Sequence, residues 1–185
     1  MVNLKKIGKQ AADVPHVLVL MRHGKAEAAS QGGDAERELT DKGRKQAKRM
    51  AKALEEMGLV PDVIASSAAT RARQTTDRML QVFGDKPTVA YHMDLYEGGV
   101  QALLDEIDHT KPTHRVLLIV CHEPTVSEAA QWLVDPDQGK PQVLGEMRLG
   151  FSPASVAILG SDKPFAEWGL HEGRPLAFVR AGDLD

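Results

Sequence analysis

Cysteine is nearly absent from this sequence, which contains Cys121 and no other among 185 residues. No disulfide can therefore form within the chain, and zinc sites built from pairs of cysteines are excluded. A chain without disulfides is typical of a reducing compartment, so we expect a cytoplasmic protein. We interpret Cys121 itself as an inert apolar residue.

Aromatic residues, long apolar runs and an excess of positive charge are also missing. Phe, Trp and Tyr together make up 4% of the residues, which leaves few rings to stack on single-stranded nucleic acid. Lys and Arg number 23 against 26 Asp and Glu, so the net charge of −3 gives no broad positive field. The longest apolar runs, residues 17–21 and 116–121, are too short to cross a bilayer. We therefore expect neither nucleic acid nor a membrane as partner.

What the sequence does contain is enough apolar material for one folded domain. Hydrophobic residues account for 42% of the chain and charged residues for 26%, as in ordinary globular proteins. Residues 1–13 are polar and lack an apolar stretch, so we interpret them as a flexible leader. Residues 14–185 are predicted to form a single domain, because their number lies within the range of one hydrophobic core.

Short apolar runs alternate with segments of helical periodicity along the chain. Residues 47–54 carry apolar side chains at the i, i+3, i+4, i+7 spacing, and Thr40 is placed to cap that helix. Six runs are predicted as strands: 17–21, 62–65, 88–91, 116–121, 155–159 and 176–179. The alternation predicts an α/β fold of three layers, with helices on both faces of a mostly parallel sheet. Residues 134–153 are rich in Pro and Gly and are predicted to be a long loop.

Charged and histidine side chains follow several of these strands where the strands end. Arg22 and His23 follow the first strand, Arg71 comes after the second, Glu97 after the third and His122 after the fourth. In open parallel sheets, ligands bind beyond the carboxyl ends of the strands. These side chains are therefore predicted to gather around one ligand at one edge of the sheet.

Four sequence blocks at these strand ends occur in a specific order. They are Arg22-His23-Gly24, Asp-x-x-Arg-x-Leu-Thr-x-x-Gly from Asp34, Ser-x-x-x-Arg-Ala-x-Gln-Thr from Ser67, and the stretch around His122 and Pro124. Together they resemble the blocks of the histidine phosphatase superfamily, and within it those of the short SixA-type phosphohistidine phosphatases. This resemblance implies a phosphoglycerate mutase-like fold and a phosphatase that needs neither a metal nor another cofactor.

The resemblance also implies a role for each matching residue. His23 corresponds to the nucleophile that forms a phosphohistidine intermediate, and His122 to a second histidine that donates a hydrogen bond to a transferring oxygen. Arg22 and Arg71 correspond to phosphate-binding residues, and arginine suits this task because its planar fork grips two oxygens and stays charged. Gly24 lacks a side chain, so we expect its backbone to approach the phosphate closely.

Two further candidates complete the predicted site. Arg37 is expected to add a third positive contact to the phosphate. Glu97 is expected to protonate the leaving oxygen, although the surrounding Leu-Tyr-Glu-Gly-Gly does not reproduce the acid block of the family. A leaving nitrogen needs less help from an acid than an alkoxide does, so this departure favours a phosphohistidine substrate over a phosphate ester.

We therefore expect a phosphatase that acts on phosphohistidine in a protein. The segment between residues 97 and 115 holds little beyond one helix, so we expect a shallow, open site unless residues 134–153 fold over it. Two other interpretations stay open. One is a phosphomonoesterase for small molecules such as a sugar phosphate or a nucleotide, which needs Glu97, Glu123 or another acid near the leaving group. The other is a module that binds phosphorylated ligands without turnover.

Basic residues are concentrated in the first long predicted helix, between residues 42 and 52. The simplest interpretation is that they form the solvated face of that helix. They could also contact an acidic partner.

Overall fold

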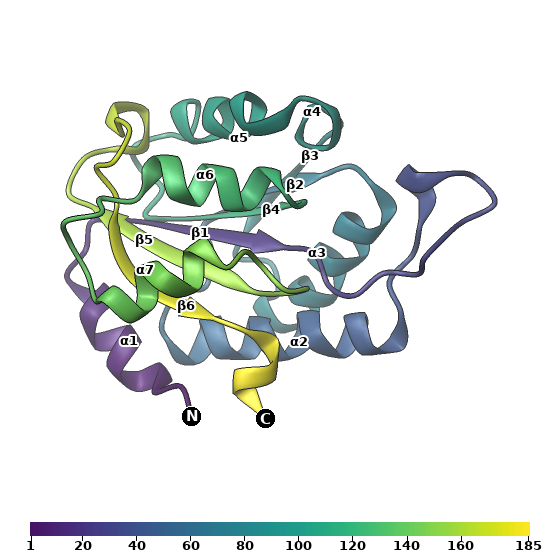
Figure 1. Ribbon diagram of the computed structural model, residues 1–185, viewed down its shortest axis with the longest axis horizontal. Coiled ribbons are helices and arrows are strands. Elements are labelled where there is room, and N and C mark those ends of the chain that lie inside the picture. The colour runs from purple at the N-terminus through teal and green to yellow at the C-terminus, as the bar shows by residue number, and fades with distance from the viewer.

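A six-stranded sheet forms the centre of the molecule (Figure 1). The computed structural model describes residues 1–185, and its strands are β1 (His16–Arg22), β2 (Val63–Ser67), β3 (Thr88–His92), β4 (Val116–Cys121), β5 (Val156–Ser161) and β6 (Arg174–Val179). Their order across the sheet is β3-β2-β4-β1-β5-β6. β3, β2, β4 and β1 are parallel to one another, whereas β5 is antiparallel to β1 and β6 is antiparallel to β5. The prediction of an α/β fold with a mostly parallel sheet is confirmed.

Helices cover both faces of this sheet (Figure 1). One face carries α1 (Leu4–Ala12), α2 (Asp41–Glu56) and α3 (Thr70–Phe83), and the other carries α5 (Gly99–Asp108), α6 (Thr125–Leu133) and α7 (Pro141–Arg148). The shorter turns are η1 (Asp34–Glu36), α4 (Asp94–Glu97), η2 (Phe165–Glu167) and η3 (Ala181–Leu184). None of the helices combines the length and the apolar character needed to cross a bilayer.

The two layers of the core follow from the alternation of side chains along each strand. In β1, Val17, Val19 and Met21 pack with α1, α2 and α3, whereas Leu18 and Leu20 pack with α5 and α6. All five side chains are completely buried. The continuous apolar run of β1 therefore reflects burial on both faces, as expected for a central strand of a parallel sheet.

Helix α2 begins where the sequence predicts. The Gly43 N–H donates a hydrogen bond of 3.0 Å to Thr40 Oγ1, which satisfies one of the free amides of the first turn. The apolar side of the helix is buried in the core. Gly58 follows the helix at a φ of 72°, a conformation that favours glycine.

The expected flexible leader at residues 1–13 is instead largely helical. Leu4–Ala12 form α1, and the side chain of Asn3 caps this helix by accepting a hydrogen bond of 3.0 Å from the Lys6 N–H. Ile7 and Ala11 lie one helical turn apart and are buried in the core. Only this narrow stripe of the segment is apolar. The polar composition of the whole segment therefore gave no sign that it packs on the core.

The expected long loop at residues 134–153 is also incorrect in part. Pro141–Arg148 form α7, which packs on α6 and β6 through the buried Met147. Pro141 stands at the first position of this helix, where the absence of an N–H costs nothing. Proline was therefore a helix-start signal in this segment rather than a loop signal.

The connection between β1 and α2 projects beyond the end of the sheet (Figure 1), and we call its residues 26–39 the flap. An isolated antiparallel bridge between Ala26 and Leu39 closes the base of the flap. η1 lies within it and contacts α3. The flap therefore stands beside the carboxyl ends of β1, β4 and β2.

Candidate active site

The histidines that follow β1 and β4 meet at the carboxyl edge of the sheet. Arg22 and Cys121 are paired in the register of these two strands, so His23 and His122 come next to each other. Their ring centroids are 5.2 Å apart. A cavity of about 270 Å³ opens here, lined by Arg22, His23, Lys25, Ala26, Arg37, Arg71, His122, Glu123 and Pro153. Its lining holds four permanent cations and one carboxylate, which makes it suitable for an anion.

The ring of His23 is held in a defined tautomer. Its Nδ1 lies 2.7 Å from the carbonyl oxygen of Gly24, which can only accept, so Nδ1 carries the proton. The other nitrogen, Nε2, accepts a hydrogen bond of 3.3 Å from Arg71 Nε. Burial of the ring lowers the pKa of His23 to about 3, so the ring is neutral at physiological pH. Nε2 therefore presents a lone pair into a cationic pocket.

His122 is placed by a residue of the neighbouring strand. Its Nε2 lies 2.7 Å from Ser67 Oγ, at the end of β2. Burial, and then the charge of Arg71, lower the pKa of His122 to about 4, so this ring is also neutral. With Nε2 engaged by the serine, Nδ1 is the nitrogen left to contact a ligand.

Two buried side-chain atoms in the whole chain lack a hydrogen-bond partner, and both belong to this cavity. They are Arg22 Nε and His122 Nδ1. Arg22 is anchored by Nη1, which donates a hydrogen bond of 2.8 Å to the carbonyl oxygen of Phe151. Burial lowers the pKa of Arg22 from its usual range. Because buried polar groups are rarely unpaired, these two nitrogens indicate a site built for a polar ligand, in which the Arg22 N–H needs an acceptor atom.

Arg71 is held by the flap. It is 5% exposed, and its Nη1 and Nη2 donate to the backbone oxygen and to Oδ2 of Asp34, at 2.7 and 3.2 Å. Arg37 Nε donates to Asp34 Oδ1 at 2.9 Å, and the Tyr96 hydroxyl donates to Oδ2 at 2.6 Å. The hydrogen bond from Tyr96, followed by the hydrogen bond from Arg37 and the charge of Arg71, holds the pKa of Asp34 well below its usual range. Asp34 is thus an ionised hub that orients two arginines of the pocket.

Asp34, Tyr96 and Ser67 were not singled out from the sequence. Asp34 and Ser67 begin two of the four blocks, so their position in these patterns was an available signal. Tyr96 had no such signal. The centroid of its ring lies 5.4 Å from that of His122, in an edge-on arrangement, and 5.6 Å from the guanidinium carbon of Arg71.

Glu97 does not reach the pocket, so the expectation that it protonates a leaving group is not supported by its placement. It is exposed and contributes nothing to the cavity lining. Consecutive residues of a helix point about 100° apart, and in α4 the neighbouring Tyr96 faces the site instead. The carboxylate that does line the cavity is that of Glu123, whose Oε1 accepts hydrogen bonds from the Ser127 N–H and hydroxyl at 3.1 and 2.6 Å.

The missing side chain of Gly24 serves the packing of α2 rather than the expected close approach to the phosphate. This glycine does not line the cavity, and its N–H donates to Thr75 Oγ1 at 3.1 Å. A Cβ on Gly24 would lie 2.6 Å from the backbone oxygen of Gly43. The absent side chain therefore lets the loop after β1 pack directly on the first turn of α2.

Cys121 and a separate acidic group lie apart from this pocket. Cys121 is fully buried, and burial raises the pKa of its thiol to about 11, which leaves it protonated.

His92, Asp94 and Glu106 place potential metal-ligand atoms within 4.8 Å of one another. His92 Nε2 lies 3.3 Å from a carboxylate oxygen of Glu106, a contact that accounts for part of this grouping without a metal.

Comparison with known proteins agrees with the sequence blocks. Residues 18–99 match the model of the histidine phosphatase superfamily (branch 1). A 2,3-bisphosphoglycerate-dependent phosphoglycerate mutase of Streptomyces griseus is 38% identical over 38% of this chain and 29% of its own length. The chain spans between 27% and 37% of the length of this and two other curated relatives.

Solved structures match most of the chain. A protein assigned as phosphohistidine phosphatase SixA from Nakamurella multipartitia is 28% identical, with a TM-score of 0.77 over 89% of this chain and 95% of that one. A SixA assignment from Agrobacterium tumefaciens is 25% identical, with a TM-score of 0.74 over 89% and 97%. The ordered sequence blocks, the paired histidines and these matches agree with one another. The matched segment is thus similar to the histidine phosphatase superfamily, and the fold of the chain to that of SixA-type structures.

Proposed function

We propose that the protein is a phosphatase in which His23 Nε2 takes the phosphoryl group from its substrate. The observation that carries this proposal is the pairing of an oriented, neutral His23 with two unpartnered donors in one pocket. Nδ1–H is committed to the Gly24 carbonyl, which leaves the Nε2 lone pair free to attack phosphorus. Arg22 Nε and His122 Nδ1 would then find their acceptors in the phosphoryl oxygens.

The reaction proceeds in two displacements at phosphorus. In the first, His23 Nε2 forms a bond to phosphorus while the bond to the leaving group breaks, and the leaving nitrogen departs as a neutral imidazole whose ring proton comes from solvent. Arg71 Nε, which donates to Nε2 at 3.3 Å, turns its hydrogen bond to a phosphoryl oxygen as the N–P bond forms. In the second, water attacks phosphorus, phosphate departs and the neutral imidazole is restored. Arg22, Arg71 and Arg37 stabilise the negative charge of both transition states.

We further propose that the preferred substrate is phosphohistidine on a protein. The pocket is small and polar, and α7 packs on α6 and β6 rather than over it. A departing imidazole is a better leaving group than an alkoxide, which suits a pocket whose one carboxylate, Glu123, already accepts hydrogen bonds from Ser127. The likeness to SixA structures supports the same substrate class. The lone, buried Cys121 is compatible with our expectation of a cytoplasmic location.

A second candidate is a phosphomonoesterase for small molecules. Glu123 lines the pocket and is therefore available as the acid that an ester leaving group needs. Curated relatives with matching segments include phosphoglycerate mutases and a Drosophila serine/threonine-protein phosphatase. In this case Glu123→Gln would slow the hydrolysis of esters far more than that of a phosphoramidate.

The decisive experiment compares three substrates under identical conditions: a phosphohistidine protein, an aryl phosphate and a sugar phosphate. We expect the highest kcat/KM on the phosphohistidine protein, and equal values on all three would refute that preference. Quenching in alkaline detergent after reaction with labelled phosphoramidate should trap a phosphoenzyme that is labile to acid and stable to alkali. His23→Asn should abolish both turnover and trapping, while the matched variant His109→Asn, on an exposed residue, should keep both. If the protein only binds phosphorylated ligands, the wild type itself will hydrolyse none of the three substrates.

A further inference from the structure

We propose that the exposed cationic face of α2 is a docking surface for an acidic region of the phosphorylated protein. The inference rests on the proposed function for the nature of the substrate. The cationic face consists of Lys42, Lys45, Lys48, Arg49 and Lys52, all of them exposed. No acidic residue occurs between positions 42 and 52, and the acidic residues of α2, Asp41, Glu55 and Glu56, stand at its two ends.

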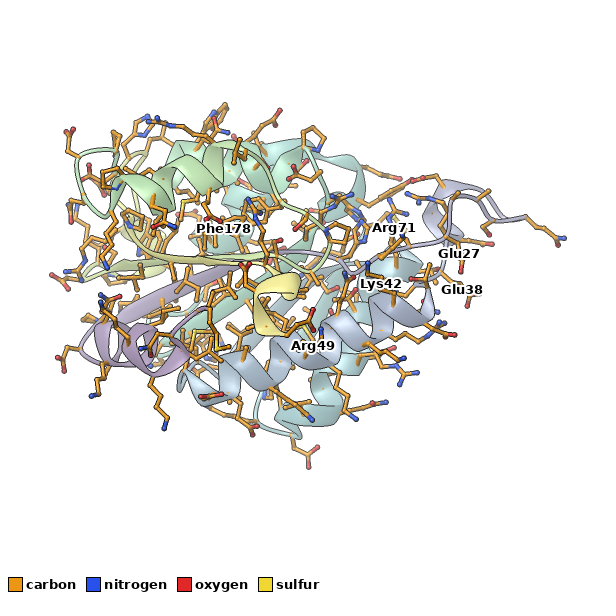
Figure 2. All side chains as sticks on the ribbon, turned by 60° about the horizontal axis from the view of Figure 1, so that its bottom comes forward. Glu27, Glu38, Lys42, Arg49, Arg71 and Phe178 are labelled. Carbon is orange, nitrogen blue, oxygen red and sulfur yellow. The ribbon has the colours of Figure 1, made fainter.

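The spacing of these residues puts them on one side of the helix. Lys42 and Arg49 are seven positions apart, as are Lys45 and Lys52, so each pair repeats after about two turns. The opposite side of α2 is buried in the core. At about 1.5 Å of rise per residue, the face extends for roughly 15 Å along the helix. Figure 2 shows Lys42 and Arg49 on α2, the former nearer to Arg71.

Most of this charge is not neutralised within the molecule. Arg49 pairs with Asp185, but Lys42, Lys45 and Lys48 form no ion pair. Like charges three or four positions apart destabilise a helix by a few tenths of a kilocalorie per mole for each pair. The arrangement therefore costs some stability and gains nothing inside the fold, whereas an external carboxylate would relieve it.

The cationic face begins at the mouth of the catalytic pocket. The backbone N–H and the hydroxyl of Thr40, which caps α2, both donate to the carbonyl oxygen of Lys25, at 2.9 and 3.2 Å. Lys25 in turn lines the pocket. A protein that places its phosphorylated side chain in the pocket can therefore reach the first turns of α2 as well.

The flap adds negative charge to the mouth of the pocket, whereas α2 adds positive charge. Glu27, Glu36 and Glu38 are exposed on the flap, and Figure 2 shows Glu27 and Glu38 beyond the Lys42 end of α2. A uniform polyanion such as a nucleic acid or an anionic membrane would be attracted by the lysines of α2 and repelled by the glutamates of the flap. A protein can place carboxylates only on the side that faces α2, so a protein surface is the favoured partner.

Synthetic peptides of equal length with a central phosphohistidine test this proposal. One carries three glutamates before the phosphohistidine, one carries them after it, and one has neutral flanks. At low ionic strength we expect one of the two acidic peptides to exceed the neutral peptide in kcat/KM by about five- to tenfold. The gain should shrink to less than about twofold at 0.5 M salt, because exposed charges are then screened.

The triple variant Lys42→Gln, Lys45→Gln, Lys48→Gln should lose this gain. The matched control changes Lys5, Lys6 and Lys9 to Gln, the same loss of charge on exposed residues of α1. Both variants should hydrolyse phosphoramidate at the wild-type rate. Equal rates on all three peptides in the wild type, or an equal loss in the control, would overturn the docking surface.

A binding measurement separates this proposal from the proposed function. Fluorescence anisotropy with labelled, unphosphorylated versions of the acidic peptides needs no turnover, so absent hydrolysis would refute the function alone. Weaker binding in the α2 variant and not in the α1 variant supports docking. Tighter binding of a DNA duplex or of phosphatidylserine vesicles through the same three lysines would overturn the choice of a protein partner.

Discussion

Acidification is expected to destabilise the fold through the two histidines of the pocket. The pKa is lowered to about 3 for His23 and to about 4 for His122, whereas an unfolded histidine titrates near pH 6.5. Their contribution to stability is fully present above pH 6.5 and is lost as the pH falls toward the folded-state values, because only the unfolded chain then takes up protons. Between pH 7.5 and pH 5.0 each histidine should cost about 2 kcal/mol, or about 4 kcal/mol together.

Such a loss is large against the total stability of a domain, which is typically about 5–15 kcal/mol. The chosen range excludes Asp34, because a carboxyl with a lowered pKa affects stability only below its unfolded value near pH 4. The measurement is urea unfolding followed by circular dichroism at several pH values across this range. His23→Asn can keep the donor to the Gly24 carbonyl and should lose about 2 kcal/mol less than the wild type on acidification. The exposed control His109→Asn should follow the wild type. An unchanged pH dependence in His23→Asn would refute the reasoning.

Four further predictions concern single positions. Arg71→Lys removes the donor to His23 Nε2 and the planar fork, so kcat/KM on phosphoramidate should fall by about 10²–10³-fold, and a loss below tenfold would contradict the assigned role. Gly24→Ala places a Cβ within 2.6 Å of a backbone oxygen, so calorimetry should show a lower melting temperature, and an unchanged one would show that the loop can move aside at no cost. Glu97→Gln should leave the rate within about twofold, because its side chain lies outside the pocket, and a larger loss would restore it as an acid. Cys121 should resist iodoacetamide at pH 8 until the protein is unfolded, because its thiol is buried and protonated, and rapid alkylation of the native protein would refute this.

The sequence contained enough information to place the main residues of the pocket. The apolar runs predicted the strands, and the residues that follow them are polar by necessity, because strand ends leave the core. Once β1 and β4 are parallel neighbours, His23 and His122 must come together, and Arg71 follows from the next strand and its helix. This part of the site was predictable because it depends on local pattern and on one general rule of sheet topology.

Other features depended on contacts between distant segments. The flap brings Asp34 to Arg71, 37 positions away, and Tyr96 reaches Asp34 across 62 positions. Nothing in the local sequence around Tyr96 indicates that it, rather than Glu97, faces the pocket. The helical turn of α4 decides this by its orientation on the neighbouring strand.

The sequence by itself determined the succession of the six strands along the chain, the helix that follows the first strand and the chemical character of the residues at the strand ends, because periodicity and residue type are local properties. Only the tertiary structure decided which nitrogen of each histidine is free, which carboxylate lines the pocket and that residues 4–12 pack as a helix. These outcomes depend on burial and on hydrogen bonds between distant segments, and such contacts exist only after the layers have packed.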